Sequence, residues 1–188
     1  MMKKLAEYAG TRKKVRLTRN RPSATQLNGY ILGVSDALVL MHPFDDFEPD
    51  GYAVIRVGDI THLRRCPYEQ WWDHMLQGEG LLDGLNKPPQ IDLSDMRSAV
   101  LGIASRYDQM IVHCEDAEEN VQDFYLGKLI GAEGNAVKFL GYDGLGYWAE
   151  TPDEIPIADI TMLEFDTPYI RIFSKYTREG TPPEFPEY

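Results

Sequence analysis

An internal repeat constrains this chain more than any other feature of its sequence. The stretch "VGDITHLRRCPYEQWW" at residues 57–72 returns as "IADITMLEFDTPYIRIF" at residues 157–173. Both stretches place an Asp-Ile-Thr triplet among apolar residues that alternate as in a strand, and a Pro-Tyr pair then begins helical spacing. A period of about 100 residues is too long for one unit of a solenoid. The sequence therefore predicts two related domains in tandem.

The repeat continues upstream in two predicted β-hairpins. Residues 28–41, "NGYILGVSDALVLM", align with residues 126–140, "LGKLIGAEGNAVKFL", and each segment has a short polar turn between two β-rich runs. A further strand is predicted before each hairpin, at residues 15–17 and 110–112. The alignment superposes two pairs of glycines, Gly29 with Gly127 and Gly33 with Gly131. Each half is thus expected to contain the same series of strands.

Helical spacing flanks the strands in both halves. Residues 92–107 predict a helix with Ser94 as its N-cap and an apolar face made of Met96, Ala99, Val100, Ile103 and Tyr107. A shorter counterpart surrounds Leu5. Each half closes with a helix that begins at the Pro-Tyr pair. We expect the apolar side chains of these closing helices in the core or at an interface: Tyr68, Trp71, Trp72, Met75, Tyr169, Ile172, Phe173 and Tyr176.

These patterns predict where the domains begin and end. We expect a first domain at residues 1–77, a linker at 78–91, a second domain at 92–177 and a flexible tail at 178–188. The linker is interrupted by glycine and proline, which are common between domains. The tail is rich in proline and acidic residues, a composition typical of segments that form no packed core.

Composition limits the class of protein. A hydrophobic content of 43% with 11% aromatic residues is typical of a folded globular chain. The sequence contains no run of about 18 apolar residues, and its first residues lack the apolar stretch of a signal peptide. We therefore expect a cytoplasmic protein. Cys66 and Cys114 lie far apart without a pairing motif, which predicts free, buried thiols.

Charge is distributed unevenly along the chain. The net charge is −11, yet residues 1–22 contain eight Lys and Arg and one acidic residue, Glu7. An acidic body repels the phosphate backbone of nucleic acids. We expect the basic segment to dock on the acidic body of its own chain or of a partner, or to be solvated, in preference to contacting nucleic acid.

The order of the predicted elements resembles the Sm-like (LSm) small-barrel superfamily. A short helix and a strand precede the run from Gly29 to Leu40, and Ile55-Arg56-Val57-Gly58-Asp59-Ile60 follows it. The duplicated layout is similar to bacterial Sm-like proteins of unknown function. The resemblance implies a mainly β fold with short helices, as two tandem Sm-like/SH3-like five-stranded barrels with flanking helices. It also implies association through strand edges, often in rings, and single-stranded RNA binding in several branches.

The RNA-binding pattern of that superfamily is only partly present. Its first motif carries an asparagine shortly after an aspartate, whereas Asp36 in this chain is followed by apolar residues. Its second motif joins a basic residue to a glycine, which Arg56 and Gly58 approximate with one residue between them. For these three residues, a structural role in turns and on a strand is the favoured interpretation. The candidate nucleic-acid-binding residues are Arg12, Lys13, Lys14, Arg16, Arg19, Arg21, Asp36, Arg56 and Gly58.

Motifs of catalysis and metal binding are absent from the sequence. It contains no G-x-S-x-G, no phosphate loop with lysine and no H-E-x-x-H. The His and Cys residues lack the paired spacing of a zinc site, and the acidic residues between Asp45 and Asp50 lack the spacing of a calcium loop. We therefore expect no metal, no cofactor and no enzymatic activity.

The sequence indicates a non-enzymatic assembly or binding module. Its expected partner is another protein or a second copy of the chain, joined through strand edges. One alternative is a single-stranded RNA-binding protein that uses the basic N-terminal segment, and another is an enzyme with an unrecognised cleft site. We expect the two halves to pack as a pseudo-symmetric pair, with the closing helices covering barrel or interface surface. Ring closure by further chains is less favoured, because the two copies have diverged.

Overall fold

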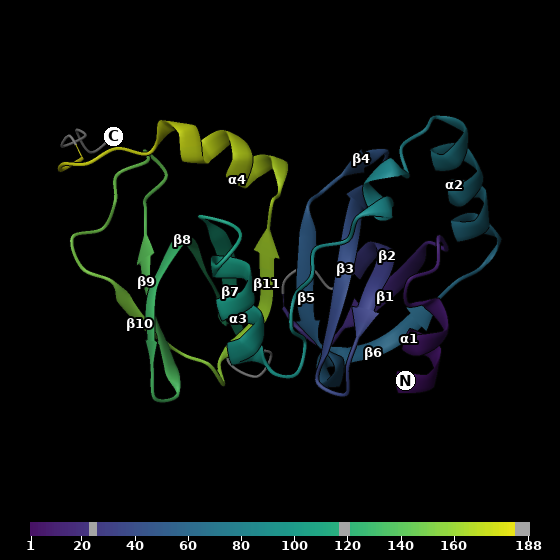
Figure 1. The fold of residues 1–188 in the computed structure, drawn as a ribbon, viewed down its shortest axis with the longest axis horizontal. Helices are drawn as coiled ribbons and strands as arrows, with labels where there is room; N and C mark the ends of the chain where they lie inside the picture. The colour runs from purple at the N-terminus through teal and green to yellow at the C-terminus, as the bar shows by residue number, and fades with distance from the viewer. Residues whose placement is uncertain (23–25, 117–120, 183–188) are drawn as a thin grey trace.

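The protein is mainly β, with one large antiparallel sheet and four short α-helices (Figure 1). The structure is a computed structural model that describes residues 1–22, 26–116 and 121–182. Most of the predicted tail, residues 183–188, therefore lies outside the described residues. Among those residues, no helix is long and apolar enough to cross a membrane.

The two halves contain closely similar elements in the same order. The first half, residues 1–78, consists of α1 (Met2–Tyr8), β1 (Val15–Arg19), β2 (Gln26–Val34), β3 (Leu38–Asp45), β4 (Glu48–Pro49), β5 (Tyr52–Arg56), η1 (Val57–Asp59), β6 (Ile60–Arg64) and α2 (Pro67–Gly78). The second half, residues 79–188, contains η2 (Asp83–Asn86), α3 (Met96–Ala104), β7 (Met110–Asp116), β8 (Val121–Glu133), β9 (Ala136–Gly141), β10 (Asp153–Pro156), β11 (Ile160–Phe165), α4 (Pro168–Phe173) and η3 (Ser174–Tyr176).

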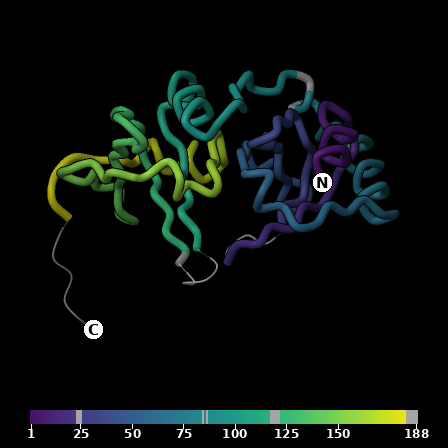
Figure 2. Tube along the Cα trace, turned by 90° about the horizontal axis from the view of Figure 1, so that it is seen from below, coloured from purple at the N-terminus to yellow at the C-terminus, as the bar shows by residue number. Residues whose placement is uncertain are grey.

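Strand order is the same in both halves. It runs β5-β3-β2-β1-β6 in the first half and β10-β9-β8-β7-β11 in the second. The halves join where β11 pairs antiparallel with β5, with Leu163 opposite Val54. The predicted contact between the halves is therefore present, and it joins two strands that are not equivalent in the repeat. Viewed from below, the halves lie side by side, with α1 toward one end and residues 174–182 at the other (Figure 2).

The sheet is open rather than closed. β6 and β10 lie at its two ends, and each pairs with only one strand among the described residues. Pairing does not close within either half, so the prediction of two five-stranded barrels is not confirmed. The structure shows a twisted antiparallel sheet that passes through both halves.

The repeated Asp-Ile-Thr triplet marks the same irregularity in both halves. Pairing of β6 with β1 shifts register beside Thr61, and pairing of β11 with β7 shifts register beside Thr161. The Thr61 hydroxyl donates to the carbonyl of Thr18 at 3.2 Å, and the Thr161 hydroxyl oxygen lies 3.1 Å from the carbonyl oxygen of His113. A β-bulge leaves one residue unpaired, and here that residue is a threonine whose hydroxyl lies beside a carbonyl of the neighbouring strand. The repeat therefore encodes a bulge at the start of the last strand.

Two of the repeated glycines lie at points of close strand approach. Gly29 in β2 is opposite Pro43, and Gly127 in β8 is opposite Gly141. A Cβ atom at Gly29 or Gly127 would overlap with a backbone carbonyl oxygen of the neighbouring strand. Glycine is therefore required by space at both positions.

The largest hydrophobic cluster spans the junction. Leu40 and Val54 of the first half pack in one cluster with Val112 and Leu163 of the second. The predicted apolar face of the helix after the linker is confirmed for four residues, which are buried: Met96, Ala99, Val100 and Ile103. The fifth, Tyr107, is half-buried and lies beyond the end of α3. The predicted cap is wrong: Asp95 is the N-cap, and its carboxylate accepts from the Ser98 N–H at 2.7 Å.

The segment predicted as a linker is partly packed. Leu82 is buried and belongs to a small cluster with Tyr30, Phe44 and Leu76 of the first half. This packing attaches the start of the connecting segment to the C-terminal part of α2. The chain then crosses to α3, which lies beside the junction in Figure 1.

Candidate functional site

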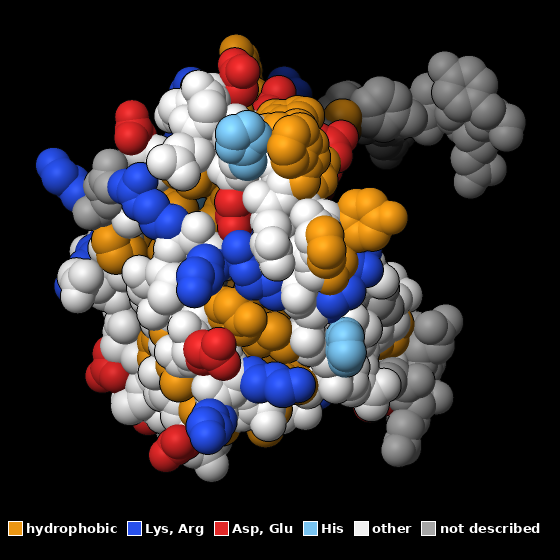
Figure 3. Space-filling view, turned by 90° about the vertical axis from the view of Figure 1, so that its right-hand side faces the viewer, with side chains coloured by type: hydrophobic (Ala, Val, Ile, Leu, Met, Phe, Trp, Pro, Cys, Tyr) orange, Lys and Arg blue, Asp and Glu red, His pale blue; other side chains and the backbone are white. Residues whose placement is uncertain are grey.

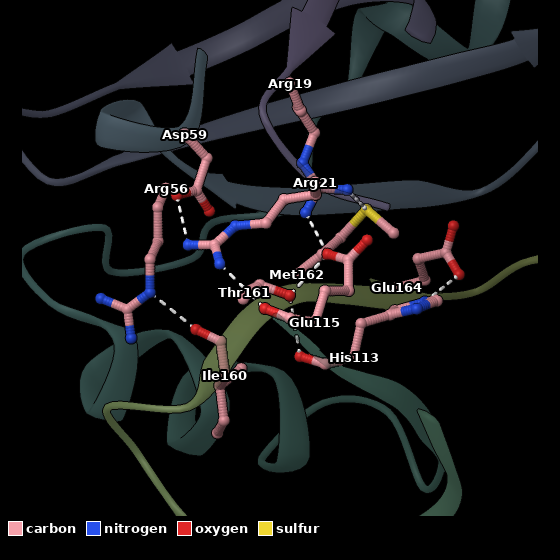
Figure 4. A network of polar contacts seen from close by, with 10 residues as sticks. All are labelled: Arg19, Arg21, Arg56, Asp59, His113, Glu115, Ile160, Thr161, Met162 and Glu164. Atoms are coloured by element: carbon pink, nitrogen blue, oxygen red, sulfur yellow. Dashed lines mark hydrogen bonds and ion pairs between the residues drawn. The ribbon is translucent and has the colours of Figure 1, made fainter. Parts of the chain in front are cut away.

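A polar network lies at the junction of the two halves (Figure 4). Arg19, at the end of β1, donates to the carboxylate of Glu115 on β7, and neither side chain is exposed to solvent. The Thr161 hydroxyl donates to the same carboxylate at 2.6 Å. The other terminal nitrogen of Arg19 lies 3.4 Å from the sulfur of Met162. Glu115 is thus bound from both β1 and β11.

Two further arginines extend the network to the protein surface. Arg21 donates to Asp59 at 2.6 Å and to the backbone carbonyl of Glu115 at 2.8 Å. Arg56, at the end of β5, donates to the carbonyls of Ile160 at 2.6 Å and Ile157 at 2.8 Å. Three arginines of the first half therefore bind backbone or carboxylate groups of the second half.

The polar network borders an acidic hollow. A hollow of about 440 Å³ beside the network is lined by Cys114, Glu115 and several other acidic residues. Burial, together with the nearby carboxylates of Asp159 and Asp123, raises the pKa of Cys114 to about 11, so the thiol is protonated at neutral pH. Within the described ranges, no group of three or more His, Cys, Asp or Glu could hold a metal ion.

The predicted nucleic-acid-binding residues are not brought together in one site. Arg19, Arg21 and Arg56 lie in the junction network. Lys14 is buried beside α2, and Arg16 donates to the side chain of Asn28 at 2.7 Å. The remaining four residues are exposed: Arg12 and Lys13, which are adjacent in the chain, and Asp36 and Gly58.

The closing helices leave outside the core most of the apolar side chains that were predicted to lie in the core or at an interface. Five are exposed: Tyr68, Trp71, Tyr169, Ile172 and Tyr176. Three are half-buried: Trp72, Met75 and Phe173. The interface part of that prediction stays a prediction.

The physical reason lies in how α2 is fixed at its N-terminus. Glu69 is buried and completes a capping box with Cys66, accepting from its backbone N–H at 2.8 Å. It also accepts two hydrogen bonds from Arg64. This cap turns the Glu69 and Leu76 side toward the body and leaves Tyr68 and Trp71 outside. Hydrogen bonds at the N-terminus of α2, rather than the spacing of its apolar residues, therefore determine which side of the helix faces the body.

The two outer strands are the unpaired edges of the sheet. β6 exposes Thr61 and His62, and its end carries the half-buried Arg64. β10 exposes Asp153 and Glu154. Charge differs between the halves in the same sense: residues 1–78 contain 11 Lys and Arg against 9 Asp and Glu, whereas residues 79–188 contain 8 against 21. The β6 end therefore belongs to the weakly basic half and the β10 end to the strongly acidic half.

No family model matches the sequence, and no match is found among curated proteins or solved structures.

Sequence reasoning missed Glu115 and Thr161 as members of the junction. Thr161 had a signal, because the Asp-Ile-Thr triplet is repeated. Glu115 had none, since its partner Arg19 is 96 residues away along the chain.

Proposed function

We propose that this chain is a non-enzymatic assembly module, built from two Sm-like small-barrel units that recruit further copies through their strand edges. The observation that carries the proposal is the pairing of β5 with β11. This contact is heterologous, because it joins the fourth strand of one half to the fifth strand of the other. A heterologous contact leaves the complementary edge free on each unit, and repetition of the contact builds rings or filaments.

The two free edge strands are the equivalents, in the other half, of the two strands that pair at the junction. β10 is the fourth strand of the second half and β6 is the fifth strand of the first half. If the register of β11 on β5 is transferred to β6 of one copy and β10 of another, Leu63 lies opposite Glu154 and Arg64 opposite Asp153. Directly opposed charges of opposite sign stabilise antiparallel pairs by about 0.2–1 kcal/mol each.

The charge distribution supports the same orientation. A copy that approaches with its acidic second half toward the weakly basic first half of another gains attraction, whereas approach of two second halves is repulsive. The interface within the chain also supports association of this kind, since it combines strand pairing with a shared hydrophobic cluster.

Sedimentation velocity over about 1–100 µM protein tests the proposal, because contacts in this affinity range are worth roughly 5–8 kcal/mol. We expect a mass that rises with concentration to that of a dimer or a closed ring. Asp153→Arg combined with Glu154→Arg should reduce the association at least about 10-fold, because the first change places a cation opposite Arg64 and the second adds another cation to the same edge. The matched control is Asp36→Arg combined with Asp108→Arg, which makes the same charge change at exposed positions away from both edges. A monomer throughout this range, or equal association of both double variants, contradicts the proposal.

A further inference from the structure

A hollow lined by aromatic side chains lies in the second half, where the connection between β9 and β10 is hydrogen-bonded to Leu126 of β8. Its volume is about 420 Å³, within the range of about 300–1,000 Å³ that is typical of small-molecule sites. Five of its lining residues are aromatic: Phe124, Tyr125, Tyr142, Tyr147 and Trp148. We refer to it as the aromatic hollow.

The repeat shows that the fold does not require all of these aromatic residues. Alignment of Gly127 with Gly29 places Gln26 and Leu27 of the first half at the positions of Phe124 and Tyr125. Phe124 is 63% exposed, so its ring contributes little to the core. A ring that is exposed, borders a hollow and is missing from the equivalent position is better explained by contact with a ligand than by folding.

The walls of the aromatic hollow are fixed by backbone contacts. The Trp148 N–H donates to the Arg178 carbonyl at 3.1 Å. Gly146 has a φ of +85°, and a Cβ atom there would come within 2.8 Å of the Tyr176 carbonyl oxygen. The rings of Tyr142 and Trp148 meet nearly at right angles, with their centroids 5.0 Å apart. A pocket with preformed walls loses little conformational entropy when a ligand binds.

Negative charge surrounds the aromatic hollow. Three lining residues are acidic, Asp143, Glu150 and Asp153, and none of the described lining residues is Lys, Arg or His. Asp143 accepts from the backbone N–H groups of Leu145 and Tyr147, both at 2.9 Å. The exposed side chains of Glu150 and Asp153 form no salt bridge within the part of the chain that the structure describes. These two carboxylates are therefore available to a cation.

Two of the rings already bind cations of the chain itself. The Lys128 ammonium lies 4.5 Å from the centre of the Trp148 ring, and the guanidinium carbon of Arg178 lies 4.5 Å from the centre of the Tyr147 ring. Neither Lys128 nor Arg178 is among the residues that line the hollow. The faces of aromatic rings attract positive charge. The hollow therefore offers the same kind of contact at a position that these two cations do not fill.

Charge across the molecule also favours a cation at this site. The hollow belongs to the second half, where residues 79–188 contain 8 Lys and Arg against 21 Asp and Glu. Burial raises the pKa of Tyr125, and nearby negative charges, including those of Asp123 and Asp153, raise it further. The α2 end of the molecule differs, because Lys and Arg side chains gather across the middle of its face (Figure 3). A cation is therefore drawn toward the aromatic hollow rather than toward the α2 end.

We propose that the aromatic hollow binds a small organic cation whose charged nitrogen carries methyl or other alkyl groups. The alkyl groups bury apolar surface against the rings, and the positive charge interacts with the ring faces. Glu150 and Asp153 balance the charge of the ligand, whereas they repel an acidic or phosphorylated one. This ligand site goes beyond the pairing of β6 with β10 and does not require it.

Choline is the probe, titrated into the full-length protein at constant ionic strength and followed by tryptophan fluorescence. We expect a saturable change with a Kd of roughly 0.1–5 mM, as suits a few cation–π contacts. The neutral alcohol in which a carbon atom replaces the nitrogen of choline should bind at least about 10-fold more weakly, because it has the same shape without the charge. Trp148→Phe should remove the fluorescence change, whereas Trp71→Phe should keep it, since Trp71 lies on α2.

Two pairs of variants locate the site. Phe124→Ala should weaken choline binding at least about 5-fold, whereas Tyr68→Ala, which removes an exposed ring of α2, should leave it unchanged. Glu150→Gln should weaken binding about 2–5-fold through loss of one exposed charge, whereas Glu79→Gln should have no effect. All four side chains are exposed, so the variants test binding without disturbing the core.

Three outcomes overturn the proposal: no saturable change up to about 50 mM choline, equal binding of the neutral alcohol, or equal affinity of Phe124→Ala and Tyr68→Ala for choline. Glu150 precedes β10, so Glu150→Gln leaves the residues of that strand edge unchanged. Failure of choline binding leaves strand-edge association intact, and loss of that association leaves choline binding intact. The two proposals are therefore separable.

Discussion

Arg19 and Glu115 form a salt bridge that is shielded from solvent on both sides and joins the first strand of one half to the first strand of the other. The Thr161 hydroxyl is also bound to this carboxylate. Removal of one partner from a buried pair leaves an uncompensated charge, which costs more than removal of both. The junction therefore depends on a pair of charges as well as on strand pairing.

Arg19→Met should lower the free energy of unfolding by about 3–5 kcal/mol, because Glu115 then stays buried without its cation. Urea unfolding followed by circular dichroism measures this change. Adding Glu115→Met should restore at least about 1 kcal/mol, since the double variant buries no charge. A single variant within about 0.5 kcal/mol of the wild type would contradict the assignment.

Gly29→Ala and Gly127→Ala should each destabilise the protein by about 1–3 kcal/mol, because the added Cβ meets a carbonyl oxygen of the neighbouring strand. Gly131→Ala is the matched control, since nothing lies within 4 Å of a Cβ built there. Thermal unfolding of the three variants provides the comparison. Equal effects at Gly127 and Gly131 would show that close strand approach is not the reason for the glycine.

Glu69 should contribute to acid stability. Burial favours its neutral form, but hydrogen bonds from Arg64 and Cys66 outweigh burial and hold the pKa of Glu69 at about 2. Because the folded-state pKa lies below the ordinary glutamate pKa of 4.5, this contribution is fully present above about pH 4.5 and is lost as the pH falls toward 2. Glu69→Gln should therefore remove about 1–2 kcal/mol at pH 7 and much less near pH 2.

Urea unfolding of Glu69→Gln and wild type at several pH values tests this window. Glu79→Gln is the control, because Glu79 is an exposed carboxylate just beyond the same helix. A difference between Glu69→Gln and wild type that does not change with pH would contradict the role given to the capping carboxylate.

Binding to single-stranded RNA should be weak. Arg19, Arg21 and Arg56 are engaged within the protein, and the net charge is −11. Fluorescence anisotropy with a short RNA should give no specific binding tighter than about 100 µM at about 0.15 M salt. Submicromolar binding that is lost in Arg12→Ala with Lys13→Ala would support the RNA-binding alternative.

The parts of the fold that could be predicted from the sequence are those that depend on local or repeated patterns. The hairpins, the buried face of α3 and the helix starts at Pro67 and Pro168 follow from spacing within about 15 residues. The Asp-Ile-Thr triplet pointed to equivalent strands because the chemistry of Thr61 and Thr161 at a bulge is local. Such features need no knowledge of distant partners.

The remaining features depend on contacts between distant residues. The orientation of α2 is set by Glu69 and Arg64, so the apolar spacing of Tyr68 and Trp71 does not reveal which side faces the body. The burial of Lys14 depends on the Trp72 ring, which lies 58 residues further along the chain. Sequence likewise gave no means of telling which strand edges meet at the junction. Burial and pairing at these positions are set by tertiary contacts.

The pairing of β5 with β11 also means that β5 stays without its neighbouring strand for some time during synthesis. Val54 lies opposite Leu163, so more than 100 further residues must be made before β5 has its neighbour. At about 5–20 residues per second this edge is left uncovered for roughly 5–20 s. Every nascent chain in that interval offers β5 to any available strand, and β11 of an adjacent chain has the same sequence as its own. Crowded synthesis of this protein should therefore yield some molecules that have exchanged their last strand.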